Sequence, residues 1–120
     1  MTRRILIADD DPLIRTLISV SLSGQAEVVE VEDGDDALAL LEDGEFDLIL
    51  LDWDMPKMNG LRVLKAIRAS GSDVPVIMVT GEAERKQVVA AVQSGVSDYV
   101  VKPFDMDIVR EKVGKFLTPV

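Results

Sequence analysis

The sequence predicts an α/β fold, a doubly wound (βα)5 three-layer sandwich in which helices cover both faces of a five-stranded parallel sheet. Three observations carry this prediction. Short apolar runs alternate five times with helix-length amphipathic segments along the 120 residues. The connections between them are only a few residues long. The central run, Leu48–Leu51, shows no polar alternation, which is typical of a strand buried on both faces.

The first strand and helix are expected on either side of an acidic loop. An apolar strand at Arg4–Ala8 runs into three consecutive aspartates. Pro12 suits the first helical position because that position needs no N–H donor, and Asp11 suits the N-cap. The side chains expected to face inward are Ile14, Leu17, Ile18 and Leu22, and Gly24 can end the helix.

The second pair of elements is more polar. Glu27–Val31 alternates enough to form a strand that is less buried than the others. We interpret Asp33-Gly34 as a turn, after which Asp35 or Asp36 opens a helix. Its inward side chains are expected to be Ala37, Leu38 and Leu41.

The central strand ends abruptly in acids and turn residues. Asp52 and Asp54 follow it, and Pro56 with the pair Asn59-Gly60 prevents the strand from continuing. The third helix that follows is expected to bury Leu61, Leu64 and Ile67 and to end near Ser70-Gly71.

Two further strand and helix pairs complete the alternation. Pro75 precedes a strand at Val76–Val79, which ends in Thr80-Gly81, and a fourth helix is expected at Glu82–Gln93. Its apolar side is expected to be Val88, Val89 and Val92. The fifth strand, Tyr99–Val101, stops at Lys102-Pro103. The last helix, capped by Asp105, is expected to bury Met106, Val109, Val113 and Phe116 or Leu117.

The amino-acid composition excludes several classes of partner and catalytic site. A net charge of −9 argues against direct partnership with nucleic acid or with anionic membranes. The absence of histidine excludes a histidine-based triad, histidine metal ligands and a phosphohistidine carried by this chain. There is no cysteine, no signal-peptide core and no apolar run long enough to span a bilayer. We therefore expect one soluble, cytoplasmic domain over residues 1–120.

Polar residues follow four of the five predicted strands. Asp9 and Asp10 follow the first strand, Asp52 and Asp54 the third, Thr80 the fourth and Lys102 the fifth. Because parallel strands deliver their carboxyl ends to one edge of a sheet, these groups are expected to converge where open α/β sheets bind ligands.

The expected cluster predicts a divalent cation and a phosphoryl group. Carboxylates about 4 Å apart repel by roughly 4 kcal/mol at an effective dielectric of 20, so a cation must compensate them. Hard oxygen ligands without histidine or cysteine favour Mg²⁺, or Mn²⁺, over zinc, and Mg²⁺ commonly shares its shell with phosphate. Lys102 suits a phosphate oxygen, Thr80 offers a hydroxyl, and Asp52 is left as the nucleophile.

Four motifs in order then resemble one family. They are Ile5-Leu-Ile-Ala-Asp-Asp-Asp-Pro12, Leu50-Leu-Asp-Trp-Asp-Met-Pro56, Val79-Thr-Gly-Glu-Ala83 and Tyr99-Val-Val-Lys-Pro-Phe104. Together they look like the receiver domain of two-component response regulators, especially the single-domain chemotaxis type, CheY. The resemblance covers the whole chain and implies a flavodoxin/CheY-like sheet of order 2-1-3-4-5.

The resemblance also implies roles for individual residues. Asp52 would be the phosphorylated residue, and Asp10 and Asp52 would bind Mg²⁺ directly. Asp9 would assist through water, and Asp54 would contribute its backbone carbonyl. Lys102 would pair with the phosphoryl group, and the Lys102-Pro103 peptide would be cis. Thr80 would swing toward the phosphoryl group, and Tyr99 would then turn inward.

The resemblance further implies partners and a mode of action. A sensor histidine kinase or a histidine phosphotransfer protein would supply the phosphoryl group. Phosphorylation would alter the face built from the fourth helix, fifth strand and fifth helix, where an output protein would dock. The chain would be a monomer, with a dimer as a further state on phosphorylation, and would catalyse only its own phosphorylation and dephosphorylation.

Two other functions fit parts of the sequence. Asp52-Trp-Asp54 also matches the DxD motif of haloacid-dehalogenase-like phosphohydrolases, but 120 residues leave no room for a cap domain. The same fold class includes FMN-binding proteins, but aspartates replace the phosphate-binding loop after the first strand. The signalling switch is therefore the main prediction.

Overall fold

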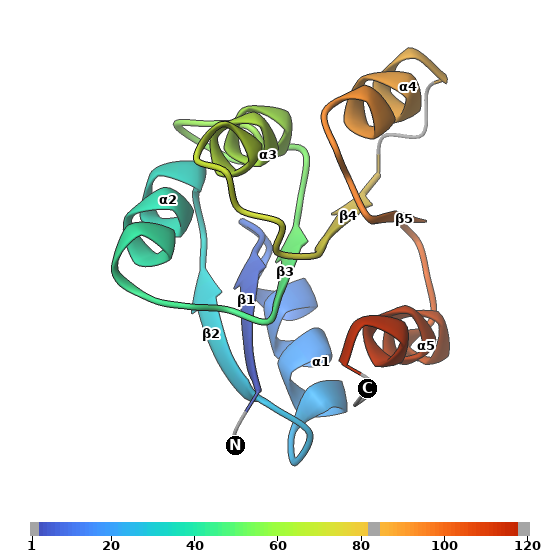
Figure 1. The fold of residues 1–120 in the computed structure, drawn as a ribbon. Helices are drawn as coiled ribbons and strands as arrows, with labels where there is room; N and C mark the ends of the chain where they lie inside the picture. The colour runs from blue at the N-terminus through green and yellow to red at the C-terminus, as the bar shows by residue number, and fades with distance from the viewer. Residues whose placement is uncertain (1–2, 82–84, 118–120) are drawn as a thin grey trace.

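A computed structural model describes residues 3–81 and 85–117 and confirms the predicted fold class. Five parallel strands form one sheet of order β2-β1-β3-β4-β5 and alternate with five helices (Figure 1). In chain order the elements are β1 (Arg4–Ala8), α1 (Pro12–Leu22), β2 (Glu27–Val31), α2 (Gly34–Asp43), β3 (Leu48–Leu51), α3 (Gly60–Ala69), β4 (Val76–Thr80), α4 (Arg85–Gln93), β5 (Asp98–Val101) and α5 (Met106–Leu117).

The sheet separates two apolar cores. Helices α1 and α5 lie on one face of the sheet, and α2, α3 and α4 lie on the other (Figure 1). Successive strand side chains point to opposite faces, so Leu48 and Leu50 of β3 enter the first core while Ile49 and Leu51 enter the second. All four are buried, and burial of each contributes roughly 1.5–3 kcal/mol. The central strand is therefore held firmly by apolar packing on both faces of the sheet.

Strand register places the acidic loops side by side. Ala8 pairs with Leu51 across β1 and β3, and the Asp52 N–H donates to the Ala8 carbonyl at 2.9 Å. At the corresponding end of the β4–β5 pair, the Lys102 N–H donates to the Thr80 carbonyl at 2.8 Å. The same edge therefore receives the residues that follow β1, β3, β4 and β5.

Two helix starts differ from the predicted turns. Asp33 is the N-cap of α2, because its carboxylate accepts the Asp36 N–H at 2.8 Å, so the helix begins at Gly34. Asn59 likewise caps α3 by accepting the Arg62 N–H at 3.0 Å, and Gly60 is the first helical residue. Both pairs were interpreted as turns because Asp-Gly and Asn-Gly have the same composition in a turn and in a cap. The expected Asp11 and Asp105 caps are confirmed.

The predicted inward face is partly wrong for both α4 and α1. Of the three valines expected to face inward in α4, Val88 is half-buried. Val89 and Val92 are 43% and 63% exposed, and Ala91 is the buried residue of α4. At 100° per residue, a helix that turns Ala91 toward the sheet turns Val92 away from it. In α1, Ile18 and Leu22 are buried as expected, but Leu17 is 42% exposed.

The last elements follow the prediction closely. β4 extends through Thr80, and β5 begins one residue early at Asp98. Val109 and Val113 of α5 are buried, with Met106, Phe116 and Leu117 packed against the first core. Glu82, the predicted first residue of the fourth helix, lies outside the described residues. Within residues 3–81 and 85–117, no helix is long and apolar enough to cross a membrane.

Candidate functional site

Asp52 lies at the carboxyl end of β3, a strand in which every residue is buried. Only 5% of it is exposed, and a long contact of 3.4 Å joins its Oδ1 to the Asp54 N–H. The loop that follows turns back sharply, because the Gly60 N–H donates to the Trp53 carbonyl at 2.7 Å. A Cβ at Gly60 would lie 2.1 Å from the Asp52 carbonyl oxygen. Glycine at position 60 therefore allows α3 to begin directly against the backbone of Asp52.

Asp9 is the second buried acid of this edge. Its N–H donates to the Val31 carbonyl of β2 at 3.1 Å, and its Oδ1 accepts the Asp11 N–H at 2.9 Å. Its Oδ2 accepts from Lys102 at 2.9 Å. Its backbone carbonyl accepts from the Arg15 Nη1 of α1 at 2.7 Å. The orientation of Asp9 is therefore fixed by contacts from β2, α1 and the loop after β5.

Lys102 reaches two of the acids at once. Its Nζ lies 2.9 Å from the Asp9 Oδ2 and 3.3 Å from the Asp52 Oδ2. The Lys102-Pro103 peptide is cis, as expected from the resemblance. The ammonium therefore lies between carboxylates that come from β1 and β3, although it is delivered by β5.

Asp9, Asp10 and Asp52 form a cluster suited to a divalent cation. One carboxylate oxygen from each of these residues lies within 4.8 Å of the others. Asp10 is exposed, whereas the other two are buried. Three carboxylates and one ammonium leave a charge of −2 at the cluster when all are ionised. Hard oxygen donors with one solvent-facing side suit Mg²⁺, which keeps several waters, and this acidic cluster is typical of the Mg²⁺ site of receiver domains.

The electrostatics of the site follow from burial and like charge. Burial first, and the Asp9 carboxylate second, raise the pKa of Asp52 to about 7, although Lys102 opposes the rise. Burial also acts to lower the pKa of Lys102, but its bond to Asp9 and the charges of both acids outweigh burial, so this pKa is raised. Lys102 is therefore charged at neutral pH, while Asp52 loses its proton at a higher pH than an ordinary aspartate does.

The remaining predicted site residues are Thr80, Tyr99 and Asp54, which differ in their burial. Thr80 is fully buried at the end of β4, opposite Val101. Tyr99 is half-buried and packs against the second core. Asp54 is exposed. Trp53 is half-buried and packs against the second core.

Sequence reasoning missed three contacts that shape the site. Arg15 binds the Asp9 carbonyl, and nothing in the helical pattern of α1 distinguishes it from a solvated arginine. Lys57, with a φ of 69°, places its Nζ 3.5 Å from the Asp33 carboxylate and so joins the loop after β3 to the start of α2. Gly60 is predicted only as a turn residue, and the sequence does not show that it begins α3 against the Asp52 carbonyl.

Known proteins resemble this chain along nearly its whole length. The family described as response regulator receiver domain matches residues 5–114. The chemotaxis protein CheY of Pseudomonas aeruginosa is 43% identical over 116 residues, which cover 93% of this chain and 94% of that protein. A CheY-like receiver domain protein from Methanospirillum hungatei has a similar structure, with a TM-score of 0.92 and 30% identity over 98% of this chain and 94% of that one. The response regulator TrrA of Thermotoga maritima, solved in complex with Mg²⁺ and BeF, gives a TM-score of 0.86 and 34% identity over 96% and 99% of the two chains.

Proposed function

The chain belongs to the response regulator receiver family of two-component signalling, and from this premise we propose that it is a switch operated by phosphorylation of Asp52. A CheY-like receiver domain is not a true enzyme. Family membership therefore argues against the phosphohydrolase interpretation of Asp52 and Asp54. The proposal extends to the whole of residues 1–120 as one receiver domain. A chemotaxis pathway is supported by the identity to CheY proteins.

One observation carries the proposal, namely the position of Lys102 between two of three clustered carboxylates. Phosphoryl transfer needs mainly positioning and neutralisation of charge. In the proposed step, a carboxylate oxygen of Asp52 forms a bond to phosphorus as the donor's nitrogen–phosphorus bond breaks, and the donor imidazole keeps the electron pair. Lys102 is close enough to transfer its contact from Asp52 to a phosphoryl oxygen.

The proposed Mg²⁺ ligands are Asp10 and Asp52 directly, Asp9 through water and the backbone carbonyl of Asp54. Bound there, Mg²⁺ would neutralise charge on the acids and on the phosphoryl oxygens. The acids would hold the cation at the solvent-facing side of the cluster, where Asp10 is exposed. Lys102, on the other side, would keep Asp9 and Asp52 from repelling each other.

Thr80 and Tyr99 are the proposed links between the site and an output surface. Thr80 ends β4, and Tyr99 lies on the neighbouring β5. The output surface is the face formed by α4, β5 and α5, which we call the α4-β5-α5 face. It carries exposed apolar side chains from each element: Val89 and Val92, Val101, and Ile108. Exposed apolar groups on three adjacent elements support a protein partner rather than a nucleic acid.

A receiver domain implies a kinase as phosphodonor and an output partner. The proposed donor is a sensor histidine kinase or a histidine phosphotransfer protein, since this chain has no histidine. A cytoplasmic location, a monomeric resting state and a dimer on phosphorylation remain parts of the same proposal. Direct contact with nucleic acid or membrane is not expected from a chain with a net charge of −9.

The fluorescence of Trp53 tests the proposal, because Trp53 is the only tryptophan and follows Asp52 directly. We expect a saturable change on titration with Mg²⁺ and a second change on addition of beryllofluoride, a phosphoryl analogue. Asp52→Ala should lose the second change. A wild-type protein that responds to neither addition would contradict the proposal.

A further inference from the structure

Arg15 connects the acidic loop to the edge of the sheet. It lies on α1, yet its side chain is only 17% exposed. Its Nη1 donates to the Asp9 carbonyl at 2.7 Å, and its Nε lies 3.5 Å from the Glu30 Oε1 of β2. A planar guanidinium can make two such contacts in fixed directions, which a lysine ammonium cannot reproduce. The side chain therefore spans from α1 to β2 beneath the loop that follows β1.

The group that Arg15 holds is the carbonyl of the Asp9–Asp10 peptide. The other polar groups of Asp9 have partners elsewhere: Val31 for its N–H, and Asp11 and Lys102 for its carboxylate. Since a peptide unit is planar, fixing this carbonyl also fixes the N–H and Cα of Asp10. Arg15 thereby fixes the direction of the backbone at Asp10.

Asp10 depends on this backbone contact more than Asp9 or Asp52 does. It is exposed, and within residues 3–81 and 85–117 its carboxylate makes no hydrogen bond or ion pair. Asp9 and Asp52 are buried and held by Lys102. We propose that Arg15, braced by Glu30, is a positioning residue that holds the Asp9–Asp10 peptide so that the Asp10 carboxylate faces the divalent cation. This inference rests on the proposed Mg²⁺ site.

Charge alone predicts the opposite effect of removing Arg15. A guanidinium close to the acids repels an incoming cation, so its loss would strengthen cation binding if Arg15 acted only through its charge. If Arg15 acts by positioning, its loss weakens cation binding in spite of the more favourable charge. The sign of the change therefore separates the two roles.

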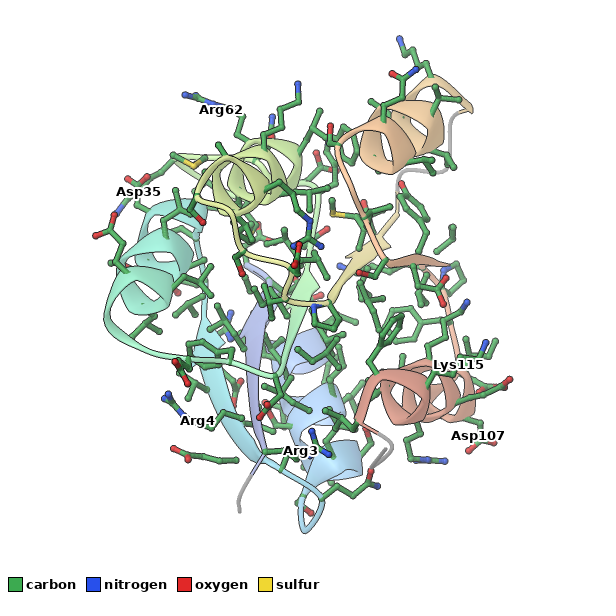
Figure 2. All side chains as sticks on the ribbon, viewed as in Figure 1. Arg3, Arg4, Asp35, Arg62, Asp107 and Lys115 are labelled. Carbon is green, nitrogen blue, oxygen red and sulfur yellow. The ribbon has the colours of Figure 1, made fainter. Side chains whose placement is uncertain are left out.

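The experiment compares Mg²⁺ affinities of full-length proteins stripped of metal with EDTA, using Trp53 fluorescence. Arg15→Met removes the contact and the charge, and Arg15→Lys keeps the charge. Arg62→Met is the matched control, because exposed Arg62 projects from α3 into solvent (Figure 2). We expect about tenfold weaker binding for Arg15→Met, as for other residues that orient a metal ligand. Arg15→Lys should lose less, and Arg62→Met should not weaken binding.

A second readout needs no metal. Hydrogen exchange of the Asp11 amide, which donates to the Asp9 Oδ1, should be faster in Arg15→Met than in wild type, while the amides of β3 remain protected. Glu30→Gln leaves Arg15 in place and should also speed Asp11 exchange, by a smaller factor. Because the loss of the Glu30 charge weakens cation binding by itself, the exchange rate is the deciding readout for this variant, which serves if Arg15→Met does not fold.

The outcomes separate this inference from the proposed function. Wild-type protein that binds Mg²⁺ together with an Arg15→Met affinity that is equal or tighter would overturn the positioning role alone. Wild-type protein without a Mg²⁺ response would overturn both. Weaker binding with unchanged Asp11 exchange would also contradict positioning through the Asp9–Asp10 peptide.

Discussion

Helices α3 and α4 cover the same face of the sheet but are held very differently (Figure 1). α3 buries Val63, Leu64 and Ile67 in the second core. α4 buries Ala91 and leaves its larger side chains Val89 and Val92 in solvent. Because burial of large apolar groups provides most of the stability of a helix in a protein, α3 is the firmly held element and α4 the weakly held one.

This difference matches the place of each helix in the chain. α3 follows the loop after Asp52, the proposed acceptor, and begins directly against its backbone. α4 follows Thr80 and leads into β5, and its weak packing would let it move at low energetic cost in the proposed switch. This face of the sheet thus combines a firmly packed helix beside the acidic edge with a weakly packed helix, α4, which belongs to the proposed output surface.

The largest predicted effect comes from adding one methyl group at the start of α3. Gly60→Ala places a Cβ 2.1 Å from the Asp52 carbonyl oxygen, so either the loop or the end of β3 must move. We expect a loss of about 2–4 kcal/mol in the free energy of unfolding and impaired phosphorylation of Asp52. Urea denaturation and phosphoryl incorporation measure the two effects.

Gly114→Ala is the matched control for this change. Gly114 lies within α5, and a Cβ there would meet no heavy atom within 4 Å. We expect this variant to gain about 0.5–1 kcal/mol, because alanine is the better helix former. Equal stability losses in the two variants would contradict the close packing of α3 against Asp52.

Much of this arrangement was predictable from the sequence. The convergence of the acids with Lys102 and the Asp11 cap follow from apolar runs ended by polar residues, and the strand order follows from the family resemblance. The burial of Ala91 rather than Val89 and Val92 was not predictable, because the larger valines dominate an apolar pattern, whereas packing against the sheet selected the small residue. The starts of α2 and α3 were missed because capping depends on side-chain direction, which composition does not encode.

The next prediction compares valines of α3 and α4 directly. Val63→Ala removes two methyl groups from a fully buried side chain, and we expect it to cost about 2 kcal/mol in the free energy of unfolding. Val92→Ala acts on a side chain that is 63% exposed and should stay within about 0.5 kcal/mol of wild type. Thermal and urea unfolding of both variants measure the difference. Comparable losses would remove the distinction between the two helices.

The smallest effect is a dependence of stability on pH in the metal-free protein. The pKa of Asp52 is raised from 3.8 to about 7 by burial and by Asp9. Between these values the folded state binds more protons than the unfolded state, so the contribution of Asp52 to stability falls as pH rises through this window. Asp52→Asn lacks this titration.

We therefore expect the Asp52→Asn variant to match wild type near pH 4, apart from a constant offset, and to become relatively more stable by about 1–2 kcal/mol at pH 8. Urea unfolding in EDTA across this range measures the change. A difference in the free energy of unfolding that does not vary with pH would contradict the raised pKa of Asp52.

The most direct test of the account is the location of the phosphoryl group. The wild-type protein is incubated with a small-molecule phosphodonor with and without Mg²⁺, and the acyl phosphate is trapped by borohydride reduction and mapped by mass spectrometry. The account predicts a single modified residue, Asp52, and modification that depends on Mg²⁺. Modification at another residue, or equal modification without a divalent cation, would contradict it.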